Sequence, residues 1–132
     1  MVLKKNKFVT LLLPNAILRK LTPEEMAVYV EPFQDEESRR PTLTFPREIP
    51  IVEEGPADVV GFVTDYFNWL KQSDTIPKLH VRAEPGFFGE YNEMAAKLFP
   101  NTRSVTVKGH HFLQEDSPDE IGVAVRDFIQ TL

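Results

Sequence analysis

Two adjacent histidines, His110 and His111, stand in the segment VKGHHFLQED. A histidine can act as a general base because the ordinary pKa of its side chain lies near neutral pH. Neighbouring residues of an extended segment point in opposite directions, so we expect only one of the two side chains to face a functional site. The alternative is that both are loop histidines bonded to the backbone.

The residues around this pair offer the base few chemical partners. Adjacent histidines rarely converge on one metal ion, and no third ligand at a suitable spacing is evident. The chain has no cysteine, and none of its serines lies in the Gly-x-Ser-x-Gly pattern of a nucleophile elbow. Glu84 could orient a histidine, although we favour a turn residue before Pro85 and Gly86. Glu115 and Asp116 precede a helix, whose N-terminus favours negative charge.

The elements that must position this loop lie in residues 55–132, where helical and strand patterns alternate. The expected elements are a helix at 56–72, a strand at 78–83, a helix at 89–99, a strand at 104–107 and a helix from 118. This order predicts right-handed crossovers and parallel strands. Functional side chains collect beyond the carboxyl ends of such strands. The loops AEPGFFGE and KGHHFLQE both follow a predicted strand at that edge, where Phe87 and Phe88 line a pocket or fill a core.

Two parallel strands are too few for a complete sheet, because a parallel sheet needs several neighbouring strands and two covered faces. The helix at 56–72 is apolar over a wide arc, which indicates cover on more than one side. The last helix should begin with a capping box at 117–120. Its inward side chains are expected to be Ile121, Val125, Phe128 and Ile129. The fold class predicted is therefore α/β, as one end of a larger sheet.

In the first part of the chain, residues 1–54, the sequence pattern predicts helices and proline-rich stretches without a convincing strand. FVTLLLPNAIL is expected to form a helix that faces the core. Thr22 and Glu25 form a capping box, which predicts a helix from Pro23 to about Glu31. Three prolines in SRRPTLTFPREIP disfavour a long regular element, yet its apolar side chains should pack on something.

The composition of the chain argues against some kinds of partner and some cellular locations. The net charge of −5 argues against nucleic acid, which favours basic surfaces. The N-terminal apolar run is about six residues, shorter than the roughly 7–15 of a signal peptide, and no apolar segment approaches a membrane span. We therefore expect a cytoplasmic protein of about one domain, with no nucleic-acid or membrane partner.

Four stretches resemble the haloalkane dehalogenase family and, equally, the Renilla-type coelenterazine luciferases that share its fold. They are RRPTLTFPREIP, GPADVV, IPKLHVRAEPG and VKGHHFLQEDSPDEIG. The resemblance covers essentially the whole chain. It implies the C-terminal half of an α/β-hydrolase fold, in which residues 1–54 are the later part of the helical cap. Residues 55–132 would then be the last two strands of the core and their helices.

The resemblance also implies a chemical role. The histidine directly before the aromatic-x-Gln-Glu-Asp run matches the catalytic base of the family, and this residue is His111. In the family an aspartate displaces the halide to form an alkyl-enzyme ester, and the histidine activates the water that hydrolyses the ester. No metal or cofactor is implied. The implied substrate pocket consists of Phe8, Leu12, Ala16, Phe45, Pro46, Ile49, Phe87, Phe88 and Phe112.

The nucleophile and the acid of that mechanism match no position of this chain, so we expect the chain alone to be inactive. Two other functions stay open. The Gly86-Phe87-Phe88 sequence resembles the luciferase pattern and favours part of a coelenterazine monooxygenase. Alternatively, the chain is a non-catalytic remnant or interaction module that associates through an exposed sheet edge.

Overall fold

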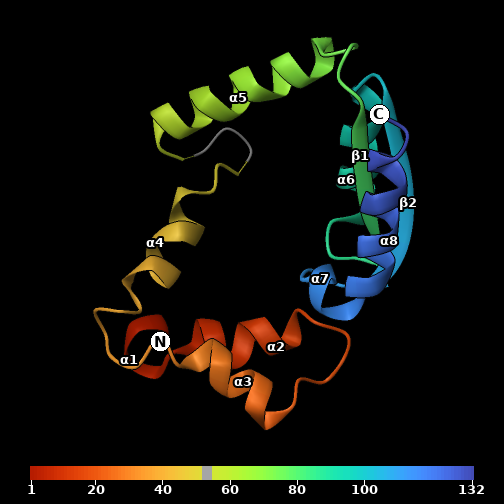
Figure 1. The fold of residues 1–132 in the computed structure, drawn as a ribbon. Coiled ribbons are helices and arrows are strands. Elements are labelled where there is room, and N and C mark those ends of the chain that lie inside the picture. The colour runs from red at the N-terminus through yellow and green to blue at the C-terminus, as the bar shows by residue number, and fades with distance from the viewer. Residues whose placement is uncertain (52–54) are drawn as a thin grey trace. The chain divides into compact units, whose positions relative to one another are not determined.

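The computed structural model describes residues 1–51 and 55–132 (Figure 1). They form two compact units, which we describe separately. The first unit contains Met1–Asn15 and Lys20–Tyr66, and the second contains Ala16–Arg19 and Phe67–Leu132. The expected boundary after residue 54 lies outside the described residues, and the division into cap and core stays a prediction.

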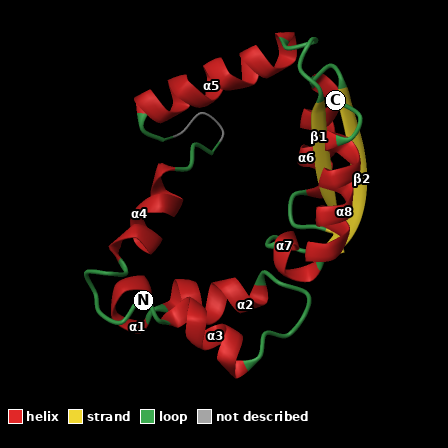
Figure 2. Cartoon of the chain, viewed as in Figure 1, coloured by secondary structure: helices red, strands yellow, loops and turns green. Residues whose placement is uncertain are grey.

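Helices make up the first unit, and Figure 2 shows them in red. They are α1 (Val2–Lys5), the π-helix η1 (Phe8–Leu12), α2 (Leu13–Asn15), α3 (Pro23–Val30), α4 (Arg40–Glu48) and the first part of α5 (Ala57–Gln72). The expected helix in FVTLLLPNAIL forms from Phe8 to Asn15. It begins with a widened π turn directly before Pro14, whose ring would crowd a carbonyl of a regular α-helix. Val9 and Leu13 of this helix are buried.

The capping box that starts α3 is confirmed. The backbone N–H of Glu25 donates to the Thr22 hydroxyl at 3.2 Å, and the backbone N–H of Thr22 donates to the Glu25 carboxylate at 2.7 Å. Pro23 has no N–H, and the capping box satisfies the N–H groups of Thr22 and Glu25, so the residue pattern alone was sufficient to place this helix start.

Three prolines were expected to disfavour a long regular element in the next segment, which nevertheless contains the nine-residue helix α4. Pro41 stands in its first turn, where no intrahelical N–H bond is needed, and Pro46 removes one bond near its end. Thr42 is buried, but Phe45 is 67% exposed and Ile49 is 46% exposed. The expected packing of these two side chains is therefore not found within the described unit.

The second unit carries the sheet, drawn in yellow in Figure 2. Strands β1 (Lys78–Pro85) and β2 (Thr102–Gly109) pair in parallel, with Lys78 opposite Thr102 and Pro85 opposite Gly109. Helix α6 (Gly89–Leu98) connects them, and the short helix α7 (Leu113–Asp116) and α8 (Pro118–Ile129) follow β2. The predicted order and the parallel pairing of the strands are confirmed, although each strand is longer than expected.

Two expectations for the last helix are wrong. Ser117 does not cap α8, because its buried hydroxyl donates to the backbone carbonyl oxygen of Lys108 at 2.7 Å. Val125 and Ile129 are exposed rather than inward, while Ile121 and Phe128 are half-buried. A sheet of two strands in the described residues offers α8 a narrow surface, so only part of its apolar face is covered.

Candidate active site

The turns that follow the two strands meet at the carboxyl edge of the sheet. The backbone N–H of Gly86 donates to the carbonyl oxygen of Gly109 at 3.0 Å, directly beyond the last paired residues. Gly86 has a φ of +69°, and a Cβ atom there would lie 2.7 Å from the carbonyl oxygen of Ala83. A Cβ atom on Gly109 would lie 2.9 Å from the Cβ of Leu113. Both positions therefore require glycine for the turns to approach this closely.

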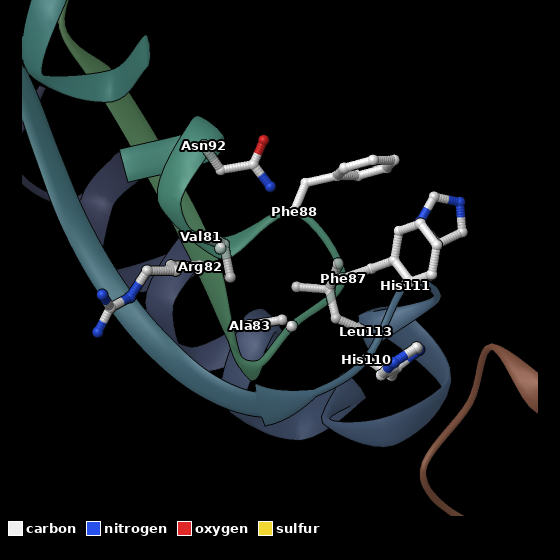
Figure 3. A pocket seen from close by; sticks show the side chains of 11 residues that line it. Val81, Arg82, Ala83, Phe87, Phe88, Asn92, His110, His111 and Leu113 are labelled. Carbon is white, nitrogen blue, oxygen red and sulfur yellow. The ribbon is translucent and has the colours of Figure 1, made fainter. Parts of the chain in front are cut away.

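A small hollow of about 60 Å³ opens between these turns. Figure 3 shows the side chains of Phe87, Phe88, Asn92, His110 and His111 on its wall. Its remaining lining residues are Val81, Arg82, Ala83, Gly86, Gly89 and Leu113. Among the described residues, no carboxylate, hydroxyl or thiol side chain lines this hollow. The site therefore holds candidate bases and hydrogen-bond donors together with aromatic walls.

His111 lies among three aromatic rings and is itself exposed. The ring centroid of His111 is 4.8 Å from that of Phe112, 5.3 Å from that of Phe87 and 6.0 Å from that of Phe88, all in edge-to-face arrangements. Such rings restrict an imidazole from several sides, and its exposed part stays accessible to solvent or substrate. This geometry suits a general base next to an aromatic wall.

His110 also lines the hollow, so the expectation that only one of the two histidines would reach the site is wrong. The ring of His110 lies 5.4 Å from that of Phe87, and Figure 3 shows the two imidazoles lying apart. Nδ1 of His110 is buried and has no hydrogen-bond partner among the described residues. The exposed His111 is consequently the better candidate for proton exchange with solvent or substrate.

Segment Ala16–Arg19 holds the histidine loop through the backbone. The N–H groups of His111 and Phe112 both donate to the carbonyl oxygen of Ala16 at 3.1 Å. The Asp116 carboxylate accepts hydrogen bonds from the backbone N–H groups of Leu18, Arg19 and His110. The sequence analysis missed this role of Asp116, because it explained the negative charge by the N-terminus of the helix that follows. No local pattern could have revealed it, because two of the donors lie about a hundred positions earlier in the chain.

The charge of Asp116 is favoured by these contacts. Burial raises the pKa of the Asp116 carboxyl, but the hydrogen bonds from the N–H groups of Arg19, Leu18 and His110 and the positive charge of Arg19 outweigh it. The pKa of Asp116 therefore lies below its ordinary value of 3.8. Arg19 also pairs with Glu115, whose Oε2 lies 2.8 Å from Nη2 of the guanidinium group.

The structure brings together only some of the predicted site residues. His111, Phe87, Phe88 and Phe112 form one cluster, and Ala16 reaches it through its carbonyl oxygen. The other predicted pocket residues lie in the first unit, and their lining role stays a prediction. They are Phe8, Leu12, Phe45, Pro46 and Ile49. Glu84 is exposed and does not line the hollow.

The described ranges contain neither a candidate metal site nor a candidate membrane span. No group of three or more histidine, aspartate or glutamate side chains that could hold a metal ion occurs in residues 1–51 and 55–132. Within the same ranges, no helix has both the length and the apolar character needed to cross a membrane.

Comparison with known proteins finds relatives that match this chain from end to end. Coelenterazine h 2-monooxygenase of Renilla reniformis is 51% identical over 131 residues, which cover 98% of this chain and 42% of the relative. A haloalkane dehalogenase of Sphingobium indicum is 50% identical over 135 residues, covering 100% of this chain and 45% of the relative. No family model matches.

Solved structures of haloalkane dehalogenases are also similar to this chain. The crystal structure of the haloalkane dehalogenase DbeA from Bradyrhizobium elkani superimposes on 99% of this chain with a TM-score of 0.92 and 41% identity, and the chain covers 45% of that structure. The predicted resemblance and the predicted α/β-hydrolase fold are confirmed. The chain spans less than half the length of the curated relatives it matches.

Proposed function

Because 99% of the chain matches part of a solved haloalkane dehalogenase, we propose that it supplies the general base of such an enzyme. His111 is that base, and haloalkanes are the substrate class. The observation that carries the proposal is the exposed imidazole of His111 among the rings of Phe87, Phe88 and Phe112, at the carboxyl edge of a parallel sheet.

The proposed reaction has two steps. A carboxylate oxygen attacks the carbon that bears the halogen, the carbon–halogen bond breaks, and halide leaves with the bonding electrons, which gives an alkyl-enzyme ester. His111 then takes a proton from water as the water oxygen attacks the ester carbonyl. The ester carbon–oxygen bond breaks, the departing alkoxide takes up the proton of the new carboxylic acid and leaves as the alcohol, and the carboxylate is restored. The aromatic walls of the hollow suit the apolar alkyl group.

The nucleophilic carboxylate belongs, in this proposal, to the part of the relatives that this chain does not match. The described residues support this division, because no carboxylate lines the hollow. The second unit also leaves large apolar side chains exposed, among them Trp69, Tyr91 and Met94. The partner we propose is the complementary part of the fold, which would supply further strands and cover these side chains.

A chimaera tests the proposed function. This chain replaces the matching segment of the Sphingobium indicum haloalkane dehalogenase, and halide release from a bromoalkane is measured. We expect turnover in the chimaera and a loss of at least about a hundredfold in His111→Ala, because general-base catalysis contributes on that order. His80→Gln serves as a control, since His80 lies on β1 away from the hollow. Equal turnover in His111→Ala and the unchanged chimaera would refute the role of His111.

A second function is favoured by the similarity to the Renilla reniformis enzyme and by the edge-to-face pair of Phe87 and Phe88, whose ring centroids lie 4.6 Å apart. In this alternative the completed pocket accepts coelenterazine. The corresponding chimaera with that enzyme should emit light with coelenterazine. Emission no greater than that of an inert protein, in a chimaera that folds, would exclude this function.

A further inference from the structure

We propose that Asp116 is a positioning residue for His111, because its carboxylate joins the histidine loop to segment Ala16–Arg19. The inference rests on the proposed function of His111 as a base. It assigns Asp116 a contribution to catalysis that acts through the backbone of the loop and involves no contact with substrate.

The contacts of the carboxylate carry this inference. The N–H of Leu18 lies 2.9 Å from Oδ1 and 3.1 Å from Oδ2, and the N–H of Arg19 lies 2.9 Å from Oδ1. The N–H of His110 lies 3.0 Å from Oδ2. The two oxygens therefore receive backbone donors from two segments at once. Hydrogen bonds to an ionised carboxylate are stronger than bonds between neutral groups, so this junction is firm.

A second set of bonds runs between the same two segments. The carbonyl oxygen of Ala16 accepts from the N–H groups of His111 and Phe112, each at 3.1 Å. Asp116 fixes the N–H of His110, and Ala16 fixes the N–H of the next residue, His111. The directions of two successive backbone N–H groups are thereby set. Since the backbone fixes the direction of the Cα–Cβ bond, these bonds set the point from which the His111 side chain extends, and the rings of Phe87, Phe88 and Phe112 then restrict its imidazole.

The chemistry of the contact favours aspartate over its closest substitutes. An ionised carboxylate only accepts hydrogen bonds, whereas asparagine would turn an NH₂ group toward one of the N–H donors. Glutamate would move the carboxylate outward by one methylene group. The neighbouring Glu115 also joins the two segments, but it does so through the Arg19 guanidinium and not through a backbone N–H next to His111.

Nuclear magnetic resonance of the isotopically labelled chain tests the inference in Asp116→Asn. We expect amide hydrogen exchange at Leu18, Arg19 and His110 to become about ten to a hundred times faster, since each loses part of a charge-assisted bond. The His111 ring signals should shift and broaden. Asp119→Asn, which makes the same charge change at an exposed site in the first turn of α8, should leave both readouts unchanged.

If Asp116 only stabilises the fold, the result is different. Asp116→Asn would then speed amide hydrogen exchange in β1 and β2 as well, and the His111 ring signals of folded molecules would keep their original positions. That outcome overturns the proposal. If Asp116→Asn does not fold, Asp116→Glu provides the same measurement with the charge retained, and unchanged His111 ring signals in that variant, despite faster exchange at the three amides, overturn it equally.

The chimaera separates this inference from the proposed function. Asp116→Asn in an active chimaera should lower kcat by about ten- to a hundredfold with little change in KM, because the base is misplaced while substrate binding is retained. An inactive parent chimaera would refute the proposed function and leave the resonance result as the test of positioning. Unchanged kcat in the variant of an active chimaera would refute the positioning role alone.

Discussion

The backbone N–H of His111 donates to the carbonyl oxygen of Ala16 at 3.1 Å, which joins the candidate base to a residue from the far end of the sequence. Segment Ala16–Arg19 consequently belongs to the compact unit that carries the sheet, although its neighbours on both sides belong to the other unit. The position of the imidazole is therefore a property of two segments, and changes in either one should affect it.

The stabilising contribution of Asp116 should depend on pH. The pKa of its carboxyl is lowered in the folded chain, so its contribution is complete above the ordinary value of 3.8 and is lost as the pH falls through the lowered pKa. We expect Asp116→Asn to reduce the free energy of unfolding by about 1–3 kcal/mol at pH 7. Urea unfolding of both proteins at several pH values checks this, and the difference should shrink in acid. A difference that stays constant down to pH 2 would contradict it.

Gly86 should tolerate no side chain. In Gly86→Ala the new Cβ would meet the carbonyl oxygen of Ala83, and the positive φ would strain the backbone by about 1–3 kcal/mol. Thermal unfolding should show a lowered Tm and a loss of signal from the sheet. Gly122→Ala is the matched control, because a Cβ atom at this position in α8 meets nothing within 4 Å. That variant should be stabilised by up to about 1 kcal/mol, so a lower Tm in both variants would argue against strain at Gly86.

The capping box of α3 should contribute measurably to stability. Thr22→Ala removes the hydroxyl that accepts from Glu25 and should cost about 1 kcal/mol in the free energy of unfolding. Glu25→Gln retains an acceptor at the third helical position and should cost less. Denaturant titration followed by circular dichroism measures both. Equal losses in the two variants would contradict this expectation and indicate that the charge of Glu25 contributes in addition to the hydrogen bonds.

The 132-residue chain by itself should release halide from a bromoalkane no faster than buffer does. The described hollow has no carboxylate to attack the carbon, and a base without a nucleophile leaves the covalent step undone. Halide measured over many hours with purified chain and with His111→Ala checks this. Release by the unchanged chain that disappears in His111→Ala would show that the chain carries its own nucleophile.

Local patterns by themselves determined much of this protein. The alternation of helical and strand patterns predicted two parallel strands joined by a helix, and the Thr22–Glu25 pattern predicted the start of α3. The position of His111 after the second strand placed it at the carboxyl edge of the sheet. These features depend on residues within one or two turns of each other, or on the period of a single element, so the sequence carries them directly.

Only the tertiary structure decided the rest, because it depends on contacts with other elements of the fold. The Asp116 carboxylate binds backbone N–H groups near residue 18, and backbone donors leave no signature in the side-chain sequence. Ser117 has the residue type of a helix cap, yet the nearby Lys108 carbonyl takes its hydroxyl. Val125 and Ile129 follow the helical apolar period but stay exposed, because a period shows that a face is apolar and the surrounding fold determines whether anything covers it.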